Sequence, residues 1–369
     1  MGYRDRLHQR RHDMRGKSAL KLLLGMCLIL ALSTSLIAGC APSGGDSSDG
    51  GSGDGSDGYG TWRYADIHPV DAPAAVMALE MAEMLKDRTD GRINIEYYPS
   101  CQLGDWSEVL ENVSVGTVDM GITSANDAYD PRYGVDWAPY RFFTWEQAWE
   151  AYEPGGWCLE ILEGIYEEHN VKFLGYGFRG FTGVSLNECP GKLPPEPVGV
   201  KIRTPGITSW KAAWETLGYI PTAIPFSEVY TSIQTGVVEG QAGGGSEQMY
   251  ILVGDLQGCW IQTNDWMDNQ PIGMNMDLWN SLSSEDQGIL MDTVEEIMWG
   301  AGGFNEQQRE LEEVWRQKAK DDYGIESIIL TEAQLAECAK AVREAVWPSL
   351  EADLGTDIYE AMIANCAAL

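Results

Sequence analysis

The chain has 369 residues, of which 44% are apolar and 22% charged, so it is long enough for two domains and ordinary in composition for a globular protein. It carries 56 acidic against 25 basic residues, a net charge of −31. Because nucleic-acid binding depends on clustered lysine and arginine, this balance argues against a nucleic-acid partner and indicates a well-solvated surface.

The N-terminus predicts an export signal. A basic segment precedes the uncharged apolar run from Leu22 to Gly39, and Cys40 follows it. The ending Ile37-Ala38-Gly39-Cys40 resembles a bacterial lipobox, so we expect residues 1–39 to be a lipoprotein signal peptide and Cys40 to carry the lipid. A retained membrane-spanning helix is the alternative, since the apolar run is just long enough. Both interpretations place the rest of the chain outside the cytoplasm, and the first anchors it to the cell membrane by its lipid.

Residues 40–59 are predicted to be a flexible Gly/Ser/Asp tether, because Ser43 to Gly58 contains no apolar side chain. Six cysteines follow the tether, and an extracytoplasmic location permits disulfides among them; the sequence leaves their pairing open. Only His68 and His169 follow Cys40, and no CxxC spacing occurs, so we expect no metal site.

The remaining sequence alternates between helix and strand patterns. The predicted order is strand 62–67, helix Pro73–Arg88, strand 92–99, helix Trp106–Val115, strand 117–123, a helical region 145–170 broken at Pro154, strands 171–178, 181–187 and 198–205, and helices Ser209–Leu217 and Glu228–Thr235. This interleaving predicts an α/β protein with sheets covered on both faces.

The last third is predominantly helical. Residues 284–322 form a nearly continuous helix pattern, interrupted at residues 300–303 by three glycines and one alanine, and Ser283 is its expected N-cap. Two more amphipathic helices are predicted, Thr331–Trp347 and Asp357–Ala367. The interrupted helix could span two lobes or stay on one with a kink, and periodicity alone leaves both open.

Residues Gly175 to Gly183 have the spacing G-x-G-x-x-G, which suggests a dinucleotide loop. Such a loop must lead into a helix whose N-terminus holds the phosphates, whereas here a strand pattern follows and Arg179 lies among the glycines. We therefore expect no cofactor at this stretch, and none elsewhere.

Arg203 stands at the end of a predicted strand, just before Pro205 and a helix. Strand ends of this kind face the crevice where α/β proteins bind ligands, and a guanidinium matches a carboxylate with two hydrogen bonds. A surface salt bridge is the alternative role for a single arginine in so acidic a chain.

Residues Gly199 to Gln241 resemble the core signature of the DctP-type solute-binding proteins of TRAP transporters. The similarity is carried by KIR-x-P, the LG-x-x-PT turn, PFSEVYTSIQTG and VEGQ, and it extends to Tyr98–Ser124 and Asp277–Leu290. The resemblance implies a class II periplasmic-binding-protein fold, with two lobes, a hinge and a long helix spanning both. We place lobe I at 60–177 plus 268–308 and lobe II at 178–267 plus 309–369.

The resemblance also implies the binding site. Arg203 would pair with a substrate carboxylate, and Arg179 matches a second, less universal arginine of the family. The family often has an asparagine where this chain has Gly243, so one carboxylate donor is missing or replaced. Phe226, Trp106 and Ser124 would line the cleft, although core packing is an alternative role for the two aromatic residues.

The expected function is therefore capture of a carboxylate by a monomeric binding protein that serves the small and large TRAP membrane subunits. A protein of similar fold that serves a sensor or another transporter is the alternative. We do not expect an enzyme, because the chain has no G-x-S-x-G and its two remaining histidines lie far apart in sequence.

Overall fold

The computed structural model describes residues 58–366. The predicted signal peptide, the predicted lipidation site Cys40 and the predicted tether up to residue 57 lie outside the described residues. Within residues 58–366, no helix combines the length and the apolar character that crossing a bilayer requires.

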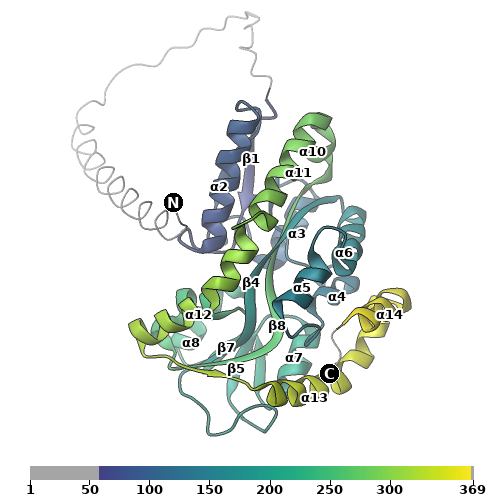
Figure 1. Cartoon of the computed structure of the whole chain (residues 1–369). Helices are drawn as coiled ribbons and strands as arrows, with labels where there is room; N and C mark the ends of the chain where they lie inside the picture. Colours follow the sequence, from purple (N-terminus) through teal and green to yellow (C-terminus); the bar gives the residue numbers. More distant parts are fainter. Residues whose placement is uncertain (1–57, 367–369) are drawn as a thin grey trace, which may run out of the picture. The chain divides into compact units, whose positions relative to one another are not determined.

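The described residues form one mixed nine-stranded sheet in the order β2-β1-β3-β8-β4-β7-β5-β6, with β9 beside β8 (Figure 1). The strands are β1 Thr61–Ala65, β2 Asn94–Tyr98, β3 Met120–Ile122, β4 Val171–Leu186, β5 Lys201–Thr204, β6 Ile220–Ala223, β7 Gly240–Ala242, β8 Cys259–Asn275 and β9 Glu326–Ile329.

Two long antiparallel strands, β4 and β8, connect the two ends of the sheet (Figure 1). β3 pairs with the end of β8, at Met120 and Met274, and β7 pairs with the end of β4, at Ala242 and Val184. We call β1–β3 the first half-sheet and β5–β7 the second half-sheet. β4 and β8 carry the chain from one to the other, as a two-lobed fold requires.

The helices cover both faces of this sheet. Their bounds are α2 Pro73–Arg88, α3 Trp106–Ser114, α4 Gly134–Trp137, α5 Trp145–Tyr152, α6 Trp157–Glu168, α7 Thr208–Thr216, α8 Val229–Gln234, α9 Ser246–Gln248, α10 Met276–Ser281, α11 Ser284–Trp299, α12 Phe304–Tyr323, α13 Glu332–Leu354 and α14 Thr356–Asn365. Three short 3-10 helices, η1 Pro131–Tyr133, η2 Phe226–Glu228 and η4 Gly254–Leu256, and one π-helix, η3 Met249–Val253, complete the set.

The apolar core is divided by the sheet. On one face of the first half-sheet, Met81 of α2 and Val294 of α11 pack on Ile122 of β3. The larger cluster includes Val109 of α3 and extends through α6 to α7 and α13, where Val342 is fully buried. The predicted α/β class, with helices on both faces, is confirmed.

The predicted long helix is two helices, α11 and α12, separated at residues 300–303. The glycines of this break are required by geometry: Gly302 has φ +69°, and a Cβ at Gly300 would lie 2.4 Å from the carbonyl oxygen of Glu296. α11 packs on α2 beside the first half-sheet, whereas α12 contacts α9 and β9 beside the second (Figure 1). The pair therefore extends along both half-sheets, and Ser283 caps α11 by accepting from the N–H of Asp286.

One prediction about strands needs correction, and one strand was missed. The two strands expected at 171–178 and 181–187 are one strand, β4, whose register shifts where it passes Gly175, Gly180 and Gly183. The long strand β8 was not predicted at all. The glycine stretch with Arg179 thus lies in mid-strand, which is incompatible with a phosphate-binding loop before a helix.

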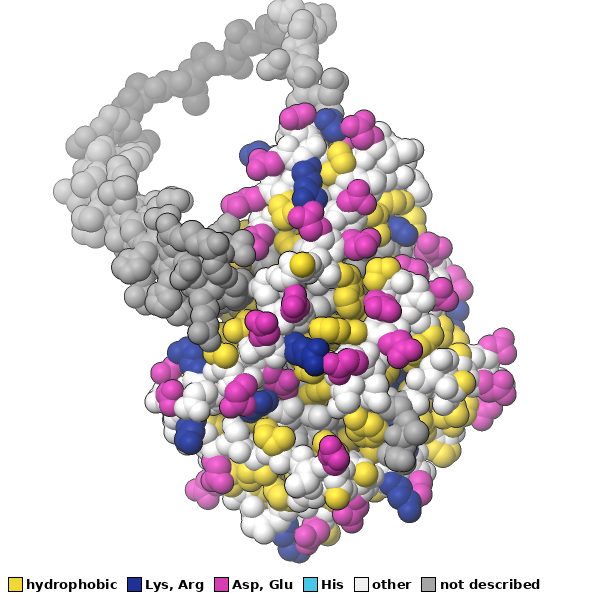
Figure 2. Space-filling model, viewed as in Figure 1, with side chains coloured by type: hydrophobic (Ala, Val, Ile, Leu, Met, Phe, Trp, Pro, Cys, Tyr) yellow, Lys and Arg dark blue, Asp and Glu magenta, His cyan; other side chains and the backbone are white. Residues whose placement is uncertain are grey.

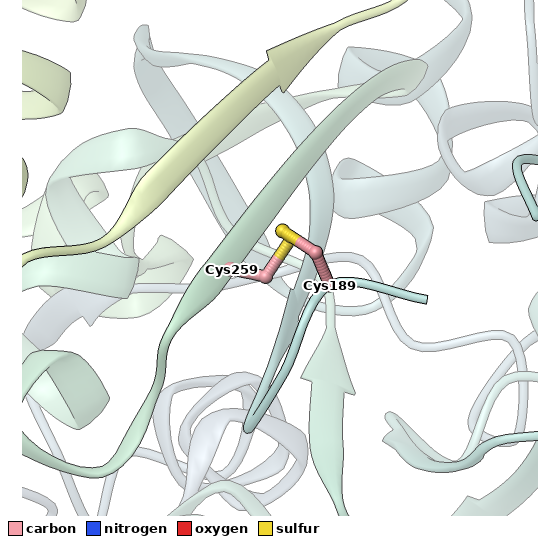
Figure 3. The surroundings of a disulfide bond; sticks show 2 residues. All are labelled: Cys189 and Cys259. Atoms are coloured by element: carbon pink, nitrogen blue, oxygen red, sulfur yellow. A yellow bond between two sulfur atoms is a disulfide. The ribbon is translucent and has the colours of Figure 1, made fainter. Parts of the chain in front are cut away.

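One disulfide joins Cys189, in the segment after β4, to Cys259 at the start of β8 (Figure 3). The other cysteines of the described part remain thiols: Cys101, Cys158, Cys338 and Cys366. On the face shown in Figure 2, acidic side chains are scattered over the surface rather than gathered in one patch. This distribution agrees with a well-solvated surface.

Candidate functional site: a tryptophan-lined cavity with one unpaired arginine

A cavity of about 70 Å³ lies where the two half-sheets meet. All six residues predicted for the site line it: Arg203, Arg179, Phe226, Gly243, Trp106 and Ser124. The structure adds neighbours that the sequence analysis missed: Ile67, His68, Ile122, Trp137, Pro205, Trp210, Gly244, Gln248, Trp266, Asp268 and Asn269.

Arg203 lies on β5, an inner strand of the second half-sheet, and is 3% exposed. Its Nε donates to the carbonyl oxygen of Ile224 at 2.9 Å, which fixes the plane of the guanidinium. Among residues 58–366, no carboxylate forms an ion pair with it, and neither Nη group has a hydrogen-bond partner. Two charge-assisted donor groups are therefore available on the cavity side.

Burial lowers the pKa of Arg203 to about 10, and the nearby Asp105 carboxylate opposes this shift only in part. The guanidinium thus stays charged at neutral pH, in a site that penalises an unpaired charge. An anion that enters the cavity relieves that penalty. The alternative role in a surface salt bridge is excluded, because the side chain is buried and unpaired.

Arg179, on β4, is in a different situation. Its Nη2 donates to Glu247 Oε1 at 2.9 Å, and its Nη1 lies 2.7 Å from His68 Nε2 and 3.2 Å from Asp268 Oδ2. Burial works against the charged form, but Glu247 and Asp268 outweigh it, so the pKa of Arg179 is raised. Its guanidinium is engaged by protein groups, although the side chain does line the cavity.

Four tryptophans form the apolar wall of the cavity. Trp137 and Trp266 stack with ring centroids 4.4 Å apart, and Trp210 meets both rings edge-on. Trp106, the first residue of α3, lies 5.7 Å from Trp137. Phe226 is 9% exposed and meets His68 edge-on. Trp106 and Phe226 thus pack against other rings and also line the cavity, so both roles considered for them apply.

Gly243 follows β7 and has φ +98°, a conformation that side-chain-bearing residues rarely adopt. A Cβ there would lie 2.9 Å from Cζ3 of Trp210 and 3.8 Å from Nη1 of Arg203. The Trp210 ring thus occupies the space that a side chain at this position would need. Ser124, 7% exposed, lies just beyond β3 on the opposite wall.

Some missed residues had a signal in the sequence. His68 comes shortly after β1 and Ser124 shortly after β3, and these strands are parallel neighbours. Their carboxyl ends must meet at one edge of the sheet, so His68 could have been found. Asp268 and Asn269 could not, because they lie within β8, whose polar, irregular sequence does not read as a buried strand.

The profile of the DctP family, described as bacterial extracellular solute-binding protein, family 7, matches residues 64–352. A solute-binding protein of Roseobacter denitrificans is 29% identical over 215 residues, which are 58% of this chain and 66% of that protein. The C4-dicarboxylate-binding periplasmic protein DctP of Rhodobacter capsulatus is 25% identical over 252 residues, 67% of this chain and 74% of the relative. For some curated relatives the chain spans only about half of their length, 49% and 51%.

Solved structures show the same fold. A TRAP periplasmic solute-binding protein of Sulfurospirillum deleyianum with bound succinate has a TM-score of 0.73 at 21% identity, over 82% of this chain and 98% of that chain. One of Desulfovibrio salexigens with bound orotic acid has a TM-score of 0.72 at 21% identity, over 83% and 97%. The profile match covers most of the sequence, and the chain therefore belongs to the DctP family of bacterial extracellular solute-binding proteins.

Proposed function

We propose that this protein binds a small organic acid anion between its two lobes and delivers it to the small and large membrane subunits of a TRAP transporter. The observation that carries this proposal is Arg203, which is buried, charged and without a carboxylate partner at the cavity. The family is one of solute-binding proteins, and neighbours of the same fold hold succinate and orotic acid. We propose binding alone, without a catalytic activity.

Closure of the lobes supplies the mechanism. With lobe I at 60–177 plus 268–308 and lobe II at 178–267 plus 309–369, the cavity lies between them. Ser124 and Trp106 then belong to one wall and Arg203 and Phe226 to the other. A ligand that contacts both walls favours the closed state by its differential affinity, and the membrane subunits would recognise that state.

The first turn of α3 supports this arrangement. Its N-cap, Asp105, accepts hydrogen bonds from Oγ of Ser227 at 3.1 Å and from the N–H of Ser227 at 3.4 Å. These bonds join the two proposed lobes at the rim of the cavity. They are therefore contacts that opening would break.

We further propose that the protein acts as a monomer held at the membrane by a lipid on Cys40, after removal of residues 1–39. A Cys40→Ser variant should lose incorporation of a labelled fatty acid and leave the membrane fraction. Retention of the label by this variant would contradict the anchor.

The direct test of binding is a thermal-shift screen of mono- and dicarboxylates on the purified protein, followed by calorimetry of each hit. Charge-assisted hydrogen bonds contribute about 1.5–3 kcal/mol each, so losing two should cost roughly 10²- to 10⁴-fold in affinity. We expect this loss in Arg203→Ala, and a large part of it in Arg203→Lys, since an ammonium cannot reproduce the planar fork.

Arg88→Ala is the matched control, because Arg88 pairs with Glu296 on α11 and does not line the cavity. It should bind every hit like the unmodified protein. A carboxylate that binds Arg203→Ala as tightly as the unmodified protein would show that the anchor is elsewhere.

A further inference from the structure

The cavity holds hydrogen-bond acceptors that have no donor. Asp268 and Asn269, on β8, line it and are 7% and 6% exposed. Among the described residues, no hydrogen bond reaches Oδ2 of Asp268 or Oδ1 of Asn269. Oδ2 of Asp268 has only the ion-pair contact with Arg179 at 3.2 Å. Both oxygens are enclosed by protein atoms, although the two residues line the cavity. Buried acceptors are normally satisfied, so a rotation of these side chains would offer acceptors to a group in the cavity that donates hydrogen bonds.

The same wall carries excess negative charge. An arginine can only donate, so His68 Nε2, 2.7 Å from Nη1 of Arg179, must be the acceptor. The other ring nitrogen, Nδ1, then donates to Oδ1 of Asp66 at 2.7 Å, and the imidazole is neutral. Arg179 is consequently the single cation of a buried cluster that holds three carboxylates, those of Asp66, Glu247 and Asp268.

A simple carboxylate on Arg203 would leave this acidic cluster uncompensated. A neutral hydroxyl could donate one hydrogen bond to it without changing its charge. A ligand ammonium does both, because it brings a positive charge and up to three N–H donors. A quaternary ammonium brings the charge but no donor, and it would leave the two acceptors unsatisfied.

We propose that the ligand is a small zwitterionic amino acid with a primary or secondary ammonium group. Its carboxylate pairs with Arg203, and its ammonium donates to Asp268 and Asn269. The tryptophan wall receives a short apolar side chain. This assignment rests on the proposed function and adds the chemical class of the substrate, with Asp268 as the residue that determines it.

The size of the cavity limits the side chain. A water molecule needs at least about 10–15 Å³ of such a volume, so 70 Å³ holds roughly five to seven waters. The ammonium nitrogen, the α-carbon and the carboxylate of an amino acid are already five heavy atoms, so this space admits a side chain of about two carbon atoms or fewer. Large aromatic amino acids do not fit without rearrangement of the tryptophans.

The test is calorimetry with matched series of acids that differ only at carbon 2. One series is valine, 2-hydroxy-3-methylbutanoate, 3-methylbutanoate and N,N,N-trimethylvaline; alanine and leucine supply the corresponding series of smaller and larger size. Both enantiomers are used. In at least one series, the amino acid should bind at least tenfold more tightly than its hydroxy, unsubstituted and trimethylated counterparts.

Asp268→Asn keeps the shape of the side chain and removes its charge. It should abolish the preference for the amino acid while leaving the binding of the hydroxy acid within about threefold. Asp255→Asn is the matched control, because Asp255 is exposed, bonds Tyr230 and does not line the cavity. Thermal unfolding without ligand shows whether each variant folds. If Asp268→Asn does not fold, the ligand series measured on the unmodified protein decides the proposal.

The outcomes separate this inference from the proposed function. If hydroxy or unsubstituted acids bind as tightly as the amino acids, and binding still depends on Arg203, the zwitterion is wrong and carboxylate capture stands. If the trimethylated ligand is preferred, the role of Asp268 and Asn269 as acceptors is wrong. If no carboxylate of any series or screen binds, both proposals fail.

Discussion

A methyl group at Gly243 tests the geometry of the cavity, because this position has two separate constraints. Gly243 has φ +98°, and backbone strain of this kind costs an L-residue about 1–3 kcal/mol. The new Cβ would also lie 2.9 Å from Cζ3 of Trp210, which is 1% exposed and packed against Trp137 and Trp266. Since the ring is packed against two other tryptophans, displacing it adds an overpacking cost of about 1–3 kcal/mol.

We therefore expect Gly243→Ala to lower the free energy of unfolding by about 2–6 kcal/mol, the sum of these two ranges. The methyl group would also stand 3.8 Å from Nη1 of Arg203, inside the cavity, so ligand affinity should fall together with stability. Urea unfolding, followed by tryptophan fluorescence and by circular dichroism, measures the first effect, and calorimetry measures the second.

Gly155→Ala separates the two constraints. Gly155 has a comparable φ of +86°, but a Cβ there would meet nothing within 4 Å. This control should show the backbone cost alone and no change in ligand affinity. If Gly243→Ala is destabilised no more than Gly155→Ala, contact with Trp210 does not restrict position 243, and our explanation for the absence of a side chain there is wrong.

Three further predictions concern other parts of the molecule. Burial raises the pKa of Asp265 from 3.8 to about 6, so the folded state holds this proton more tightly than the unfolded state. The free energy of unfolding should therefore fall by up to about 3 kcal/mol as the pH rises from about 4 to 6. Asp265→Asn should remove this pH dependence, and identical pH profiles for the variant and the unmodified protein would contradict the shift. Replacing Cys189 and Cys259 by serine should cost about 2–4 kcal/mol of stability, and a reductant should lower the unfolding midpoint of the unmodified protein but not of this variant. Ser227→Ala should weaken ligand binding roughly two- to fivefold at unchanged stability, as one hydrogen bond across the closed lobes is lost; unchanged affinity would argue against closure at this contact.

The sequence by itself determined most of the local structure. Pro73–Arg88 was predicted and found as helix α2, and the break at residues 300–303 separates α11 from α12 as expected. Proline at a helix start, a serine cap and a glycine turn act through neighbouring backbone atoms, so a short window contains the information. The family resemblance also identified six residues that line the cavity, including Arg203.

The tertiary structure alone decided how the two arginines differ. Both lie in strand-like sequence, yet Arg179 contacts Glu247 and Asp268, whereas among residues 58–366 the guanidinium of Arg203 bonds only a backbone carbonyl. No rule of spacing predicts these partners, because they come from different strands and helices. The neutral state of His68 and the unsatisfied acceptors on β8 arise in the same way.

The tertiary structure also decided the strand β8. Its buried polar residues interrupt the apolar alternation by which a strand is recognised, and they are tolerated because other parts of the fold supply their partners: Asn269 donates to Asp136 of α4, and Asp265 accepts from Thr182 of β4. Apart from β8, most of the secondary structure followed from local sequence. The charge, burial and hydrogen bonding of the site followed from contacts between residues far apart in the chain, which exist only once the sheet has formed.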